Sequence, residues 1–84
     1  MNNLETLRNE INDIDSQIFQ LLNLRHSVVK KVGQYKKENN LPVLDSSREK
    51  IIETKIKTQF QGPEGEYINQ IYKSVMNVSK NIQY

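Results

Sequence analysis

The side chains in this sequence best suited to chemistry are cations on one face of a long predicted helix. Arg25 occupies a slot in an apolar three-four spacing where Leu or Val is expected, and a guanidinium keeps its charge even in an apolar site. Lys36 follows eleven residues later, close to three helical turns, so the two side chains project from nearly the same face about 16 Å apart. Such a pair leaves a gap suited to a small dianion.

Arg8 lies on the same broad side of this helix but 17 residues before Arg25, or about 25 Å along the axis. It cannot reach the same small ligand from the same helix. If Arg8 joins the site, it must therefore come from another chain.

Further polar residues gather at two other places in the sequence. Ser79 and Gln83 are four residues apart and share one face of a C-terminal helix, beside its apolar row. Asp45, Arg48 and Glu49 surround the start of a middle helix, where free backbone N–H groups point outward. Together with the cations, these residues offer one pocket both hydrogen-bond donors and carboxylates.

Each of these residues also has an ordinary structural explanation. Charged residues such as Arg8, Lys36 and Glu49 are usually solvated surface, and the C-terminal polar pair could be surface as well. For Arg25 the alternative is a buried polar residue that sets helix register. His26, the single histidine, lies next to the apolar row, and we assign it no chemistry.

The composition indicates one small helical domain over residues 1–84, because the chain has no cysteine, two prolines and three glycines. We expect a soluble, cytoplasmic protein, since no secretion signal or membrane span is evident. A net charge of +2, with acids and bases interspersed, argues against nucleic-acid binding. The sequence has no metal-ligand cluster, phosphate loop or Ser/His/Asp set, so any catalysis must rely on positioning and fixed charges, without cofactor or metal.

Three helices are expected. The first runs from about Leu4 to Lys37, and a turn over residues 38–44 follows it. The second begins at Ser46, with Glu49 at capping-box spacing, and ends at Gly62 and Pro63. The apolar row of the first helix consists of Leu4, Leu7, Ile11, Ile14, Ile18, Leu21, Val28, Val32 and Tyr35. A chain this short buries only about 60 per cent of its unfolded surface alone, so we expect an obligate oligomer that completes this row.

Five short motifs, in this order, resemble the all-helical (type II) chorismate mutases over nearly the whole chain. They are L-R-x-x-I-x-x-x-D at Leu7–Asp15, L-x-x-R at Leu22–Arg25, V-G-x-x-K at Val32–Lys36, P-V-x-D-x-x-R-E at Pro42–Glu49 and S-x-x-x-Q at Ser79–Gln83. In this comparison, the third helix opens at Tyr67 and Ile68.

The resemblance implies an intertwined homodimer of three-helix protomers with paired long helices. It also implies the Claisen rearrangement of chorismate to prephenate, a unimolecular reaction that uses no cofactor. Arg25, and Arg8 from the partner, would clamp the two substrate carboxylates, and Lys36 would contact a carboxylate and the ether oxygen. The remaining implied contacts are a hydrogen bond from Gln83 to the ether oxygen, binding of the ring hydroxyl by Glu49 with Asp45, support from Arg48, and a hydrogen bond from Ser79 to the ring-side carboxylate.

Three other functions stay open on the sequence. The chain could be a regulatory chorismate- or prephenate-binding domain of a shikimate-pathway enzyme. It could be an isochorismate pyruvate lyase with the same fold and similar charges. It could also be a helical dimerisation module without a ligand.

Overall fold

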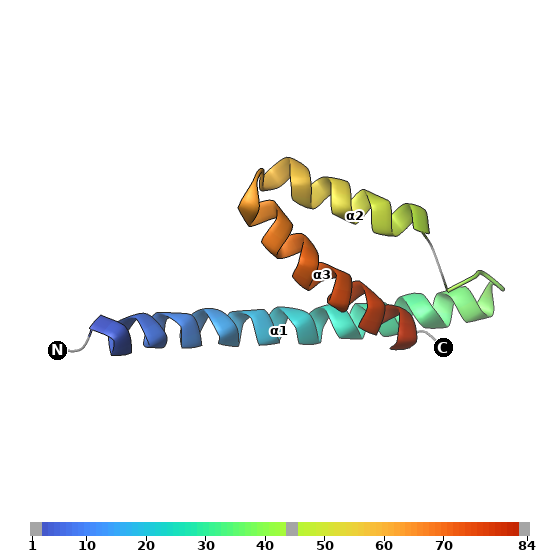
Figure 1. Cartoon of the computed structure of the whole chain (residues 1–84). Coiled ribbons are helices and arrows are strands. Elements are labelled where there is room, and N and C mark those ends of the chain that lie inside the picture. The colour runs from blue at the N-terminus through green and yellow to red at the C-terminus, as the bar shows by residue number, and fades with distance from the viewer. Residues whose placement is uncertain (1–2, 44–45, 83–84) are drawn as a thin grey trace.

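The computed structural model describes residues 3–43 and 46–82, apart from the side chain of Ser46, and these residues form three helices. They are α1 (Asn3–Glu38), α2 (Ser46–Gln59) and α3 (Pro63–Ile82). In Figure 1, α1 is a long rod, and α2 and α3 form a hairpin whose last helix crosses the C-terminal half of that rod. This arrangement confirms the predicted all-α fold class.

Helix α1 extends one residue beyond each predicted end, and its 36 residues span about 54 Å. It ends in a Schellman motif. Asn40 has a left-handed backbone, with φ of 57°. The Leu41 N–H donates to the Lys36 carbonyl at 2.8 Å, and the Asn40 N–H donates to the Lys37 carbonyl at 3.4 Å. The predicted turn is therefore present.

Helix α3 begins at Pro63, so the predicted start at Tyr67 was wrong by four residues. Proline suits a first helical position, because its fixed φ matches the helix and its missing N–H would have no partner there. Gly62 precedes it with φ of +78°, and its carbonyl accepts from the Glu66 N–H at 3.3 Å. Glu64 lies in the first turn, where its negative charge interacts favourably with the helix dipole. The sequence carried this start signal, which the apolar pattern obscured.

Helices α2 and α3 pack closely where their hairpin turns. A Cβ on Gly65 would lie 1.9 Å from the Phe60 carbonyl oxygen, so only glycine fits there. Ile56 on α2 and Asn69 on α3 are both buried in this hairpin region of the chain. Among the described residues no donor reaches the Asn69 Oδ1 atom.

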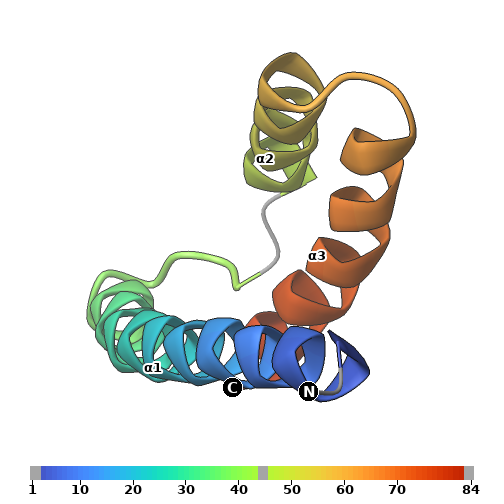
Figure 2. The same cartoon turned by 90° about the vertical axis from the view of Figure 1, so that its left-hand side faces the viewer.

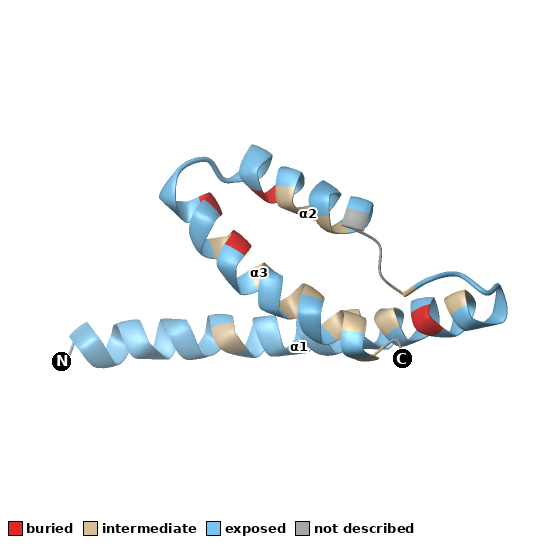
Figure 3. Ribbon diagram, turned by 45° about the vertical axis from the view of Figure 1, so that its right-hand side comes forward, coloured by how far each residue is buried: buried red, intermediate tan, exposed pale blue. Residues whose placement is uncertain are grey.

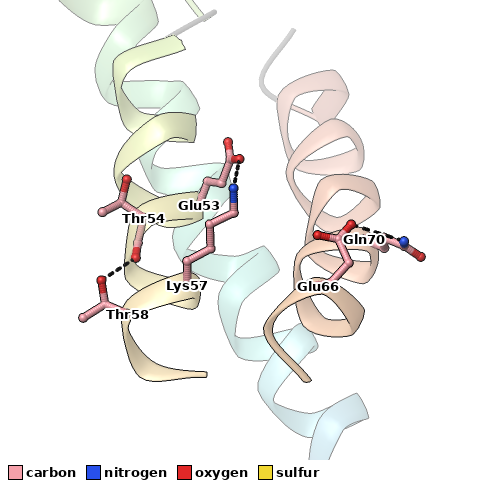
Figure 4. A network of polar contacts seen from close by, with 6 residues as sticks. All are labelled: Glu53, Thr54, Lys57, Thr58, Glu66 and Gln70. Atoms are coloured by element: carbon pink, nitrogen blue, oxygen red, sulfur yellow. Dashed lines mark hydrogen bonds and ion pairs between the residues drawn. The ribbon is translucent and has the colours of Figure 1, made fainter. Parts of the chain in front are cut away.

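The hairpin carries side-chain hydrogen bonds that each stay within one helix (Figure 4). Lys57 Nζ lies 2.9 Å from Glu53 Oε1, and Gln70 donates to Glu66 at 3.3 Å. The hydrogen bond and charge of Lys57 lower the pKa of Glu53, and the same contact raises the pKa of Lys57. These local bonds support the individual helices and leave their mutual arrangement to side-chain packing.

Most of the apolar surface of α1 is uncovered. Its predicted apolar row is 41 to 64 % exposed, and Figure 3 shows the N-terminal half of the helix as almost entirely exposed. Within the described part of the chain, Ile56 is the single buried hydrophobic residue. Viewed along α1, helix α2 and the beginning of α3 stand away from this helix, whereas the C-terminal end of α3 reaches it (Figure 2). The radius of gyration is 16.3 Å, against about 12 Å for a compact domain of this length.

No helix in residues 3–43 and 46–82 has the length and apolar character needed to cross a membrane.

Candidate active site

A cavity of about 260 Å³ lies where the C-terminal half of α1 meets the start of α2 and the end of α3. Each helix contributes both polar and apolar side chains to its wall. The charged and polar lining residues are Arg25, Lys36, Arg48, Glu49, Ser79 and Lys80. The apolar lining residues are Val28, Val29, Val32, Val43, Ile52 and Met76. The volume is close to the lower end of the usual range for small-molecule sites, about 300 Å³.

Arg25 is half-buried and is held by two residues of α3. Its Nε donates to the Tyr72 hydroxyl at 3.1 Å, and its Nη1 donates to Ser79 Oγ. Its Cζ also lies 5.3 Å from the centre of the Tyr72 ring, within the range of a cation–π contact. The interruption of the apolar row is therefore occupied by a cation with polar partners inside its own chain.

The Ser79 hydroxyl also donates to the carbonyl of Val75, one turn earlier, at 2.8 Å. A hydroxyl has one hydrogen to donate and two lone pairs that accept. In this arrangement Ser79 accepts from Arg25, and its hydrogen is directed to its own helix. To donate to a ligand carboxylate, Ser79 must first turn its hydroxyl away from Val75.

Lys36 is placed by the end of α1 and the turn that follows it. Its Nζ donates to the Val43 carbonyl at 3.0 Å, which holds the half-buried side chain beside the cavity. Arg48 and Glu49 come from the first turn of α2 on the opposite wall. The lining thus includes four cationic side chains and one carboxylate, and this positive balance suits a ligand with two negative charges.

The structure brings together five of the eight predicted site residues, although they come from three helices. These five are Arg25, Lys36, Arg48, Glu49 and Ser79. Arg8 lies on the exposed N-terminal part of α1, away from the cavity. Asp45 and Gln83 fall outside the described residues. The roles assigned to all eight residues stay predictions.

Two residues near the cavity were missed by sequence reasoning. Tyr72 was not among the predicted site residues, yet its hydroxyl accepts from Arg25. Lys80 lines the cavity although it follows Ser79 directly and therefore does not share the predicted face. Tyr72, Met76 and Ser79 follow one another at three-four spacing and so share one face of α3, which was a usable signal for Tyr72. No spacing pattern pointed to Lys80.

The profile of the family described as chorismate mutase type II matches residues 7–84. The chain belongs to this family. It is 38 % identical over 82 residues to the bifunctional chorismate mutase/prephenate dehydratase of Buchnera aphidicola subsp. Acyrthosiphon pisum, which covers 93 % of this chain and 21 % of that protein. It is 44 % identical over 55 residues to the protein of the same name from Buchnera aphidicola subsp. Schizaphis graminum, which covers 66 % of this chain and 14 % of the relative.

Solved structures of the same shape include the chorismate mutase (form II) of Thermus thermophilus. The TM-score is 0.91 at 25 % identity, over 98 % of this chain and 94 % of that one. A conserved hypothetical protein from Pyrococcus furiosus has a TM-score of 0.83 at 33 % identity, over 100 % and 99 % of the two chains. The chain spans about a fifth or less of the length of the two Buchnera relatives.

Proposed function

We propose that this chain catalyses the rearrangement of chorismate to prephenate. The observation that carries the proposal is the convergence of Arg25, Lys36 and Arg48 from two helices on one partly apolar cavity, in a chain of the type II chorismate mutase family. The reaction is a unimolecular Claisen rearrangement, in which the ether C–O bond breaks as a C–C bond forms. It therefore needs a substrate folded into a chair-like conformer and stabilisation of charge on the ether oxygen.

Binding follows from the charges of the cavity. Chorismate carries two carboxylates, and guanidinium groups bind carboxylates through paired N–H donors. Arg25 is the clamp for one carboxylate, because its plane is already held by α3. Lys36 contacts a carboxylate and the ether oxygen, where its ammonium stabilises the negative charge that develops in the transition state. The valine and isoleucine side chains of the wall exclude water and strengthen these interactions.

The other contacts complete the substrate's hydrogen bonds. Gln83 donates to the ether oxygen, and Glu49 accepts from the ring hydroxyl with the help of Asp45. Arg48 supports the substrate from the first turn of α2. Ser79 donates to the ring-side carboxylate after its hydroxyl turns away from the main chain.

A second copy of the chain completes both the fold and the site in this proposal. The chain exposes 7162 Å², whereas a compact protein of 9.9 kDa exposes about 5200 Å². The excess of about 2000 Å² per chain is typical of an obligate interface. An intertwined homodimer with paired α1 helices covers the apolar row and carries Arg8 of each chain into the cavity of the other.

Purified protein and the loss of chorismate absorbance test the proposal, with prephenate identified as the product. Lys36→Ala should lower kcat/KM by about 100-fold or more, because one preorganised donor is lost. Lys37→Ala is the matched control, since Lys37 is exposed on the next position of α1 and does not line the cavity. If the Lys36→Ala variant kept as much turnover as the Lys37→Ala variant, the assigned site would be contradicted.

Isochorismate serves as the second substrate in the same assay. Release of pyruvate from isochorismate without conversion of chorismate would replace the proposal with a lyase. The absence of turnover and of any melting-temperature shift with a bicyclic dicarboxylate transition-state analogue would leave a dimerisation module.

A further inference from the structure

Tyr72 holds the Arg25 guanidinium in two ways at once. Its hydroxyl accepts from Nε at 3.1 Å, and its ring lies 5.3 Å from Cζ. Tyr72 is half-buried on α3, one turn before Met76 of the cavity wall. Tyr72 is not among the described residues that line the cavity. It therefore contacts Arg25 from outside the cavity and acts on a bound ligand through Arg25.

The consequence lies in how a guanidinium binds an anion. Its five N–H donors form a planar fork, and a carboxylate takes two of them along one edge. With Nε directed to Tyr72 and one N–H of Nη1 directed to Ser79, the second N–H of Nη1 and the two of Nη2 remain for a ligand. The contact with Nε therefore limits rotation of the guanidinium plane and helps to set which N–H groups face the cavity.

We propose that Tyr72 is a positioning residue that orients Arg25 toward a ligand carboxylate. The identity of that ligand rests on the proposed function, but the control of Arg25 geometry does not. The hydroxyl is the important group, because the ring alone leaves Nε without an acceptor.

Tyr72→Phe isolates this contribution, since it keeps the ring and removes the hydroxyl. Tyr67→Phe is the matched control, because Tyr67 lies on the same helix and is 67 % exposed. A carboxylate clamp acts on substrate and transition state alike, so Tyr72→Phe should raise KM for chorismate by about 3- to 10-fold with a smaller change in kcat. The Tyr67→Phe enzyme should keep both constants. Equal kinetics of the two variants would overturn the proposal.

A double-mutant cycle separates positioning from a general packing effect. Arg25→Lys keeps the charge but has no Nε, so Tyr72→Phe should cause no further loss in the Arg25→Lys background. Fold-losses that multiply independently in the two backgrounds would show that Tyr72 acts without Arg25 and would refute the proposal.

Exchange of arginine Nε–H protons, followed by NMR on the whole protein, gives a readout that needs no activity. The sequence has three arginines, so the signals are few enough to assign by substitution. The Arg25 signal should exchange slowly in the wild type and in Tyr67→Phe, and faster in Tyr72→Phe. An Arg25 signal unaffected by Tyr72→Phe would overturn the proposal. Absence of wild-type turnover would instead count against the proposed reaction, and this measurement would still decide the role of Tyr72.

Discussion

Mixing two inactive variants tests how the active site is shared between chains. Arg8 and Arg25 are separated by 17 residues of continuous helix, or about 25 Å, and the cavity extends from Arg25 still further from Arg8. Arg8 of one chain therefore cannot complete the cavity of the same chain. Arg8→Ala and Arg25→Ala should each lower kcat/KM by about 100-fold or more, if each guanidinium binds a charged group of the transition state.

The expected recovery follows from counting sites in a symmetric dimer. Equal amounts of the two variants, after subunit exchange, give heterodimers as about half of all dimers. In each heterodimer the chain with Arg8→Ala still has its own Arg25 and receives an intact Arg8 from the other chain. The second site lacks both arginines. One working site in half of the dimers restores about a quarter of wild-type activity.

Chorismate absorbance measures this recovery, and differently tagged chains measure the exchange. The matched control mixes Arg8→Ala with the double variant Arg8→Ala/Arg25→Ala, in which no combination of chains forms an intact site. Recovery should be absent from this control. If the first mixture kept only the low activity of the two single variants although subunit exchange was demonstrated, the shared site would be refuted. Equal recovery in both mixtures would show that the recovery does not depend on Arg8 and would also refute the shared site.

Three further predictions concern pH, packing and surface charge. Gln83→Glu should move the rate optimum toward acid, because a carboxyl donates only when protonated whereas an amide donates throughout, and an unchanged pH–rate profile would refute the role of Gln83. Gly65→Ala should destabilise the fold by about 1 to 3 kcal/mol in chemical denaturation, because its Cβ meets the Phe60 carbonyl at 1.9 Å, and an unaltered midpoint would contradict this close approach. Glu53→Gln should lower Tm slightly near neutral pH, because it removes the ion pair with Lys57. The pKa of Glu53 is lowered in the fold, so the stabilisation should be present above the ordinary carboxyl pKa, be lost as the pH falls through the lowered pKa, and weaken in high salt. A Tm difference that persists in acid would contradict this ion pair.

The helices of this protein could be predicted from local patterns because helix formation depends on short-range features. The three-four spacing and the Asn39–Asn40 turn located α1 to within one residue at each end. The same geometry placed Arg25 and Lys36 on one face, since residues three turns apart are aligned on any regular helix. The start of α3 was missed because its first turn carries proline, glycine and two acids instead of apolar residues, so periodicity had nothing to detect there.

Contacts between helices could not be predicted from the sequence, because they depend on the angle and depth at which α3 crosses α1. No spacing within α1 indicates that Tyr72 meets Arg25, because the two residues are 47 positions apart and their pairing is set by side-chain packing. The same crossing brings Lys80 to the cavity wall and the Ser79 hydroxyl to Arg25. Residue type alone gave none of these partners.

The sequence by itself determined three helices, a cation in an apolar row and the family to which the chain belongs, because each of these depends on the order and spacing of residues. Only the tertiary structure decided which side chains share the cavity and what holds Arg25 in place. The physical reason is that a helix arranges its own residues by its period alone, whereas contacts between helices depend on how their surfaces pack.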